Sequence, residues 1–254
     1  MGSLHFTMIS SGSRGNSTLI WDQEDIIIID FGITLRKLKN RLEEINLDLG
    51  SASLFISHEH TDHSKGIPYL TRNHSIDIYS KEATLSALGL RDGYGIKEKT
   101  AIGNFSITSV PVSHDAADPV GYVLKWGRRK ITVVSDLGVV PPRLIEEARG
   151  SDILAFEANH DVEMLKNGRY PLQLQKRILG RQGHLSNDQS AEAISQIASS
   201  WTRIVLTHLS QENNTPEKAA TTVRSYLDNR DIAYASLECA TQELGTPVYT
   251  LETD

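Results

Sequence analysis

A single run of six residues, His58-Glu59-His60-Thr61-Asp62-His63, concentrates side chains that could do chemistry. Imidazole and carboxylate groups are ligands for Zn²⁺, Mn²⁺ and Fe in proteins. His58 and His60 are two positions apart, so in an extended segment both rings project to the same side and could bind one metal ion. Asp62 and His63 come after the chain turns and could bind a second ion. The run therefore predicts a site for two divalent metal ions.

Further candidate ligands follow aliphatic segments elsewhere in the chain. There are four of them: His114 after residues 110–112, Asp136 after 131–134, His160 after 153–156 and His208 after 204–206. Strand ends at one edge of a sheet bring such side chains together. Asp136 is the candidate for a carboxylate that bridges two ions, which at roughly 3.5–4 Å would share a hydroxide and stabilise an in-line displacement. His5 and His74, by contrast, fit structural roles.

Length and composition limit the classes of protein to consider. With 254 residues, 39% apolar and 23% charged, the chain suits a soluble enzyme, and we interpret residues 1–254 as one domain. It shows neither an apolar run of the about 20 residues that span a bilayer nor a signal peptide. One cysteine, Cys239, excludes an internal disulfide and suits a reducing cytoplasm. The net charge of -6 restricts any nucleic-acid surface to a local patch.

Short β-rich runs alternate with helical patterns along the whole chain. Strands are expected at residues 4–9, 18–21, 25–30, 54–57, 76–79, 105–112, 121–126, 130–135, 153–156, 204–206, 232–237 and 248–251. Helices are expected at 34–45, 65–72, 81–88, 141–148, 187–199 and 216–227, with Asn187 as the cap of the fifth. This order predicts an α/β protein with two stacked sheets and helices outside them.

The ordered set of ligands resembles the metal motifs of the metallo-β-lactamase superfamily. The motif His58-x-His60-x-Asp62-His63 is followed by His114, Asp136 and His208, and Asp30-Phe31-Gly32 matches the aspartate that supports the metal loop. The resemblance covers nearly the whole chain and implies a four-layer αββα sandwich. It also implies that His58, His60 and His114 bind one ion, that Asp62, His63 and His208 bind the other, and that Asp136 bridges them.

Longer strings are similar to one bacterial group of that superfamily, the WalJ/YycJ group. They include Ser11-Gly12-Ser13-x-Gly15-Asn16, Phe156-Glu157-Ala158-Asn159-His160-Asp161, Gly183-His184-Leu185-Ser186-Asn187 and the run from His208 to Asn214. The group's members are cytoplasmic exonucleases that digest double-stranded DNA from 5′ to 3′, with links to mismatch repair. The resemblance therefore implies DNA as the substrate and possible mismatch-repair partners.

Departures from other branches narrow the substrate. Cys239 lies after the last metal motif, so the cysteine ligand of many lactamases has no counterpart. His114-Asp115-Ala116-Ala117 departs from the proline-glycine-histidine pattern of glyoxalases. The 71 residues from 137 to 207 are too few for the extra domain of RNase J-like nucleases and leave no long arm like that of tRNase Z. Nitrogen and oxygen ligands with a bridging aspartate favour phosphate chemistry.

Candidate substrate contacts lie outside the metal motifs. Residues 161–187 carry five cations against two acids, and Arg169, Lys176 and Arg177 are predicted to contact phosphates, an ordinary solvated face being the alternative. Ser13 and Asn16 belong to a glycine-rich loop that could bind an anion through its N–H groups. By resemblance, His184 would hold the scissile phosphate. His160 would protonate the leaving oxygen or orient a ligand.

The resulting hypothesis is a dinuclear phosphodiesterase, a 5′–3′ exonuclease on double-stranded DNA, in which a metal-bridging hydroxide attacks phosphorus and Asp62 helps to orient it. Zn²⁺, Mn²⁺ and Fe all suit the ligands. One alternative is a phosphodiesterase of the same fold that acts on cyclic or mononucleotides, for which a closed pocket would be expected. The other is a binding subunit without catalysis, which the complete set of ligands disfavours.

Overall fold

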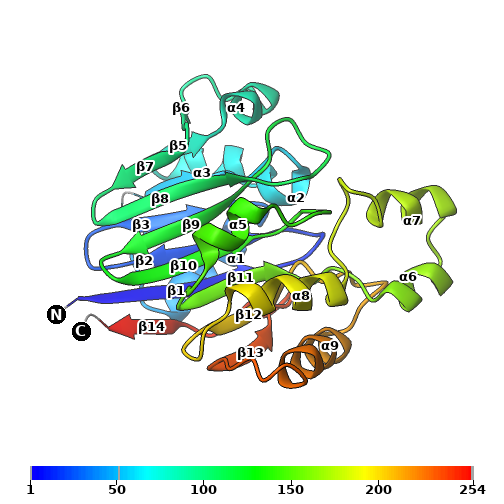
Figure 1. Cartoon of the computed structure of the whole chain (residues 1–254). Coiled ribbons are helices and arrows are strands. Elements are labelled where there is room, and N and C mark those ends of the chain that lie inside the picture. Colours follow the sequence, from blue (N-terminus) through cyan, green and yellow to red (C-terminus); the bar gives the residue numbers. More distant parts are fainter. Residues whose placement is uncertain (1, 51, 253–254) are drawn as a thin grey trace.

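The computed structural model describes residues 2–50 and 52–252, which form two seven-stranded sheets packed face to face (Figure 1). The strand order of the first is β14 (Tyr249–Glu252), β1 (Ser3–Ser10), β2 (Ser17–Trp21), β3 (Ile26–Ile29), β4 (Ala52–Phe55), β5 (Ile76–Ser80) and β6 (Tyr94–Gly95). That of the second is β13 (Ser236–Cys239), β12 (Arg203–Thr207), β11 (Ile153–Glu157), β10 (Arg129–Val134), β9 (Val120–Trp126), β8 (Phe105–Pro111) and β7 (Lys99–Ile102).

Helices cover the outer face of each sheet. The helices that follow strands of the first sheet are α1 (Leu35–Glu44), α2 (Thr61–Ser64), α3 (Ile67–Asn73) and α4 (Glu82–Leu88). Those of the second half are α5 (Pro142–Ala148), α6 (Val162–Asn167), α7 (Leu172–Ile178), α8 (Asn187–Ile197) and α9 (Pro216–Asp228). The order helix, sheet, sheet, helix confirms the predicted four-layer αββα sandwich.

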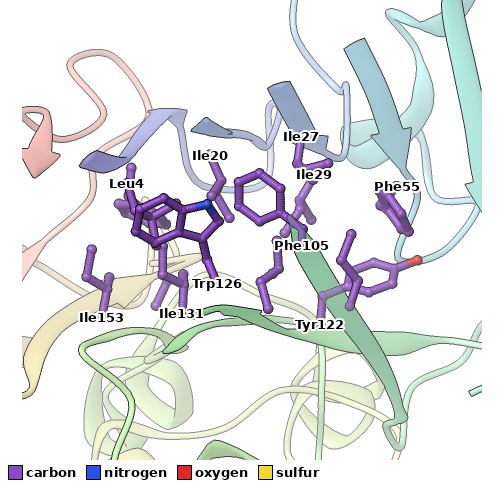
Figure 2. Close-up of a cluster of buried hydrophobic side chains, with 14 of the residues drawn as sticks. Leu4, Ile20, Ile27, Ile29, Phe55, Phe105, Tyr122, Trp126, Ile131 and Ile153 are labelled. Carbon is purple, nitrogen blue, oxygen red and sulfur yellow. The ribbon is translucent and has the colours of Figure 1, made fainter. Parts of the chain in front are cut away.

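Three buried clusters fill the three interfaces between these layers. Between the sheets, Ile27 and Ile29 of β3 meet side chains such as Phe105 and Tyr122 of the second sheet (Figure 2). Ile26 and Ile28 point the other way and pack under α1. The run of four isoleucines is therefore buried on both faces, because alternate side chains of a strand project to opposite sides of the sheet. The third cluster lies under α5, α8 and α9.

The parallel strands β10, β11 and β12 end at the same height in the second sheet. Val134 pairs with Phe156, and Phe156 pairs with Leu206. The residues that follow these strands, including Asp136 and His208, therefore start from one edge. The parallel strands β3 and β4 of the first sheet end close to this edge of the second sheet. This register is what assembles the site from segments far apart in the sequence.

Several expected boundaries differ from the observed ones. The predicted helix 65–72 corresponds to α3, which has Pro68 in its first turn, and the short helix α2 precedes it. The cap of α8 is Ser186 rather than Asn187, because Ser186 and Gln189 form a reciprocal capping box while Asn187 bonds to Asn214. The predicted strand 232–237 begins only at Ser236, where β12 offers a partner.

Three other features complete the comparison with the expected elements. The strands β6 and β7 and the helices α2, α6 and α7 were not expected. The helices α6 and α7 project from the body as a small lobe, residues 162–183 with the connecting turns (Figure 1). In the described part of the chain, no helix is both long and apolar enough to cross a membrane.

Candidate metal centre

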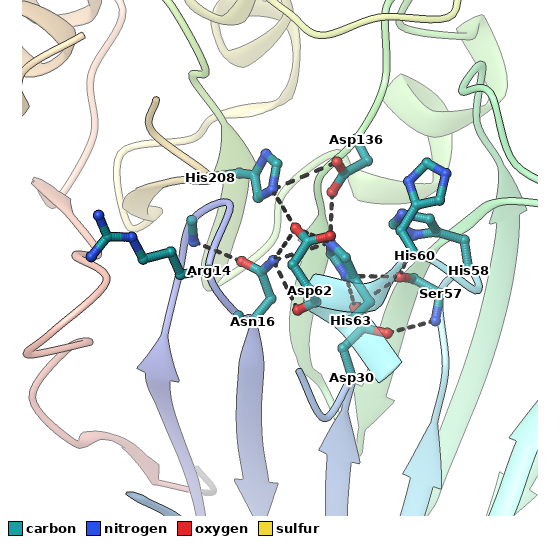
Figure 3. A network of polar contacts seen from close by, with 12 residues as sticks. Arg14, Asn16, Asp30, Ser57, His58, His60, Asp62, His63, Asp136 and His208 are labelled. Atoms are coloured by element: carbon teal, nitrogen blue, oxygen red, sulfur yellow. Dashed lines mark hydrogen bonds and ion pairs between the residues drawn. The ribbon is translucent and has the colours of Figure 1, made fainter. Parts of the chain in front are cut away.

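Asp30 fixes the loop that carries the histidine motif. Its carboxylate accepts hydrogen bonds from the Ser57 N–H (2.7 Å) and hydroxyl (2.8 Å), and its Oδ2 lies 2.7 Å from Nδ1 of His63. Nε2 of His63 is therefore directed toward the other candidate ligands (Figure 3). Gly32 permits this close packing, since a Cβ there would lie 1.6 Å from the backbone oxygen of Asp62. The end of β3 thus orients His63 through its second ring nitrogen.

The first donor set consists of His58, His60 and His114, whose ring nitrogens lie within 4.8 Å of one another. Nε2 of His114 is 3.3 Å from Nδ1 of His60. The other nitrogen of His114 lies 3.1 Å from the carbonyl oxygen of Gly183, which fixes the ring. Nε2 of His58 is buried with no hydrogen-bond partner among the described residues. Imidazole nitrogens that converge in a buried space fit a metal cation.

The second donor set consists of Asp62, His63 and His208. Oδ2 of Asp62 is 3.2 Å from Nε2 of His208 and 3.4 Å from Nε2 of His63. Asp136 lies between the two sets: its carboxylate is 3.1 Å from Nε2 of His63, 3.6 Å from Nε2 of His208 and 3.7 Å from Nε2 of His114. The predicted ligands are thus brought together, and Asp136 occupies the position expected of a bridge.

The electrostatics of the two sets differ. Burial alone lowers the pKa of His208, but Asp136 and Asp62, together with a further carboxylate, raise it to about 10. Burial would raise the pKa of Asp136, yet the surrounding histidines, His208 first, hold it well below its usual range. For His58 and His114 burial outweighs the nearby carboxylates and lowers the pKa. His58 and His114 therefore offer neutral imidazoles, whereas His208 holds a proton that a metal must displace.

Glu157, at the end of β11, is a buried acid that was not among the predicted site residues. Its carboxylate lies 2.8 Å from Nδ1 of His184 and 3.2 Å from Nδ1 of His208, and it accepts hydrogen bonds from the N–H groups of Asp136 (3.2 Å) and Leu185 (3.0 Å). Burial raises its pKa, but the two histidines lower it to about 2. The available signal was a carboxylate that ends the wholly apolar run Ile153–Phe156.

His184 lies at the centre of the site, beside both donor sets. Its ring is stacked on His208 with centroids 5.3 Å apart and lies 5.1 Å from the ring of His114. Its Nδ1 is engaged by Glu157, which leaves Nε2 for another partner, and 19% of the side chain is exposed. Glu157 raises the pKa of His184 in spite of burial. A partly exposed imidazole of this kind can donate to an anion.

His160 is placed differently, because it is buried (1% exposed) and does not belong to either donor set. Neither ring nitrogen has a hydrogen-bond partner among the described residues. Burial lowers its pKa to about 4, so the ring is neutral at physiological pH. Its backbone oxygen accepts a hydrogen bond from Asn187 at the start of α8. Its predicted catalytic role stays a prediction.

The glycine-rich loop of residues 10–16 lies against Asp62 and His63. The Asn16 amide is 3.2 Å from Oδ2 of Asp62 and 3.0 Å from Nε2 of His63, and its oxygen accepts a hydrogen bond from the Gly12 N–H. These contacts give Asn16 a positioning role toward candidate ligands, and its predicted contact with substrate is untested. Ser13, in contrast, is exposed at the tip of the loop.

The predicted phosphate-binding cations lie on the lobe. Arg169, Lys176 and Arg177 are exposed, and Arg177 forms an ion pair with Asp115 (2.6 Å), the residue after His114. A cavity of about 630 Å³ with Arg177 and Arg181 in its lining lies between the lobe and that segment, and an adjoining one of about 600 Å³ reaches His114. An open groove lined by Arg177 and Arg181, together with Asp115 and Asp118, therefore leads to the first donor set.

Comparison with known proteins agrees with this fold. Residues 26–209 match the family model described as a β-lactamase superfamily domain. Exodeoxyribonuclease YycJ of Bacillus anthracis is 32% identical over 238 residues, 89% of this chain and 90% of that protein. Exodeoxyribonuclease WalJ of Streptococcus pneumoniae serotype 2 strain D39 is 34% identical over 242 residues, 89% of each chain. The metallo-β-lactamase fold protein YhfI from Bacillus subtilis has a TM-score of 0.74 at 16% identity, covering 98% of this chain and 100% of that one.

The fold and the clustered donors define a hydrolase with a site fitted to metal. The chain belongs to the metallo-β-lactamase superfamily and, within it, to the family of the YycJ and WalJ proteins. The matched segment includes every candidate ligand from His58 to His208. The resemblance stated from the sequence is thereby confirmed.

Proposed function

We propose that this protein hydrolyses phosphodiester bonds in double-stranded DNA as a 5′–3′ exonuclease that uses two divalent ions. The observation that carries the proposal is the pair of donor sets with Asp136 between them, on a chain whose relatives are named exodeoxyribonucleases. The metal could be Zn²⁺, Mn²⁺ or Fe, since nitrogen and oxygen donors suit all three.

In this proposal His58, His60 and His114 would hold one ion, Asp62, His63 and His208 would hold the other, and Asp136 would be shared between them. When bound, the ions would lower the pKa of water and neutralise negative charge on the phosphate. The chain fixes their positions through groups that touch the ligands. Asp30 holds His63, and Glu157 holds His208. Such contacts set the orientation of the imidazoles.

Asp62 and His184 are the residues proposed to act on the reacting groups. The Asp62 side chain is 23% exposed, against 4% for Asp136, so it can face the nucleophile and orient it. Nε2 of His184 can donate a hydrogen bond to a non-bridging phosphate oxygen, because Glu157 keeps Nδ1 occupied. His160, buried and neutral, would serve the leaving group only through an intervening group such as water.

The lobe is proposed to bind the phosphate backbone of the substrate. Arg177 lines the groove that reaches His114, Arg169 and Lys176 are exposed elsewhere on the lobe, and Ser13 would contact the strand from the opposite loop. Asn16 would support this loop. An open groove with cations on one wall suits a polymer, whereas a cyclic or mononucleotide would be expected in a closed pocket. The groove is thus the observation that favours DNA over the small-molecule alternative.

The test is digestion of double-stranded DNA labelled at either the 5′ or the 3′ end, in Mn²⁺, with products resolved over time. Stepwise shortening from the 5′ end is expected, and Asp136→Ala should abolish it. Asp77→Ala, at an exposed aspartate in β5, is the matched control and should retain activity. Turnover of a model phosphodiester without digestion of DNA would leave the metal site intact and overturn the proposed substrate.

A further inference from the structure

A second cavity, of about 430 Å³, adjoins the metal centre on the side of His208. Residues from three segments line it: Ser11 of the loop of residues 10–16, residues 209–211 with 214–216, and residues 240–244. Ser11 connects the cavity to the site, because it contributes to the lining and its hydroxyl accepts a hydrogen bond of 2.8 Å from the His208 N–H. Figure 3 shows His208 beside the loop that carries Arg14 and Asn16. Leu209, the next residue after His208, also lines the cavity.

The charge of this cavity is unlike that of the groove beneath the lobe. Its described lining contains no lysine or arginine. The one charged residue of the described lining is an acid, Glu243. The lining therefore offers no ammonium or guanidinium group to a phosphate. The cavity therefore does not suit the backbone of a nucleic acid.

The chemistry of its walls suits a neutral group with apolar faces and a polar edge. Leu209, Ala240 and Leu244 provide apolar surface. The amide of Asn214 is already used by bonds to the chain, whereas Gln211 is exposed at the rim and offers both donor and acceptor atoms. The volume falls within the range of about 300–1,000 Å³ that is usual for small-molecule sites. Nucleobases have this combination of flat apolar faces and a hydrogen-bonding edge.

We propose that the cavity receives the base of the terminal nucleotide, unstacked from the duplex, while its phosphodiester lies at the donor sets. The inference rests on the proposed function. A phosphate held beside His208 lies one residue from the cavity wall, so the base attached to the same nucleotide can enter it. The duplex backbone would then follow the groove with Arg177 and Arg181 on the His114 side. The cavity and the groove would thus receive chemically different parts of the substrate.

The experiment uses duplexes with 2-aminopurine at the 5′-terminal nucleotide, the 3′-terminal nucleotide or an internal position. Binding is followed by anisotropy of a distal dye, and base unstacking by 2-aminopurine fluorescence. Wild-type protein is measured in EDTA, and again metal-loaded on duplexes whose terminal linkages are phosphorothioates. The described lining contains no aromatic residue that would quench an inserted base. We expect the fluorescence of a terminal 2-aminopurine to rise on binding, with no change at the internal position.

Two variants connect this signal to the cavity. Leu244 is 83% exposed, so Leu244→Gln removes an apolar wall without disturbing the core, while Val248→Gln, at an exposed valine outside the lining, is the control. Wild type should bind a duplex with an abasic terminal nucleotide about fivefold more weakly than an intact one, as expected for one lost base contact. Leu244→Gln should reduce this ratio and the fluorescence rise, and Val248→Gln should not.

The outcomes separate the two proposals. DNA binding with unchanged 2-aminopurine fluorescence at both termini, or an equal response of the two variants, would overturn base insertion and leave the nuclease proposal standing. Absence of any anisotropy change, under both metal conditions, would overturn DNA as the substrate and the inference with it.

Discussion

The metal centre and the lobe lie next to each other but are built in opposite ways. In the centre, His63, Asp136 and His208 are almost fully buried, and each contacts other polar groups of the site. On the lobe, Arg169 and Lys176 are exposed and form no ion pair within the described ranges. The centre therefore resembles a polar core, whereas the lobe is a solvated surface.

The difference follows from what each region would have to do. Ligands must keep their geometry in the absence of substrate, and buried partners such as Asp30 and Glu157 restrict their rotamers. Cations that contact the phosphates of many different DNA sequences gain from freedom to adapt, and exposed side chains on short helices retain it. Substitutions in the centre should therefore have large effects on metal binding, and substitutions on the lobe should have smaller effects that depend on salt.

The largest effect is expected for Asp136→Asn. Loss of the shared carboxylate removes the charge that lies between the donor sets, so metal content should fall and phosphodiester hydrolysis should drop by at least about 1,000-fold. Metal content is measured by elemental analysis beside activity on a model phosphodiester. Retention of two ions with normal turnover would contradict the assignment of Asp136 as bridge.

A smaller loss is expected for Glu157→Gln, which alters only a group that contacts ligands. A glutamine cannot accept from all of its donors, because its NH₂ group would face a backbone N–H or an imidazole N–H. Metal affinity should fall about 10–100-fold, as measured by competition with a chelating dye. Gln175→Glu, in the lobe, is the control, because it adds a buried charge away from the ligands. Its metal affinity should stay unchanged.

The pH dependence of metal binding should separate the two regions. In the metal-free protein the pKa of His208 is raised to about 10, so the ring is protonated at neutral pH and must lose that proton to bind metal. Affinity should therefore increase with pH, by about tenfold per unit for each proton released, up to about pH 10. Titration calorimetry in buffers of different ionisation enthalpy measures the release. DNA binding by the lobe should vary little between pH 6 and 9, because guanidinium groups stay charged.

The smallest effect is expected for charge reversal on the lobe. Arg169→Glu with Lys176→Glu should weaken DNA binding and reduce the slope of log Kd against log salt by about one for each lost phosphate contact. Hydrolysis of a model phosphodiester should be unchanged. The same pair of reversals at Arg36 and Lys39, exposed on α1, is the control. Equal weakening by both pairs would show that the lobe has no special role in binding.

The sequence determined the chemistry of this protein to a large extent. The spacing of His58, His60, Asp62 and His63 predicted the donor sets, and short β-rich runs predicted most strands, because these signals are local. The family and the four-layer fold were predicted from longer strings and are confirmed. The assignment of residues 1–254 to one domain, the cytoplasmic location and the mismatch-repair partners stay predictions.

Other features were decided only by the tertiary structure. Glu157 gained its importance because β10, β11 and β12 end in register, which places His184, His208 and the N–H of Asp136 around one carboxylate. Ser186 rather than Asn187 caps α8, because the Asn187 side chain is hydrogen-bonded to Asn214, which lies 27 positions away in the chain. The lobe and the cavity beside His208 depend on how distant segments meet. Such contacts leave no periodic pattern along the chain, because the residues that form them come close to one another only when the layers pack.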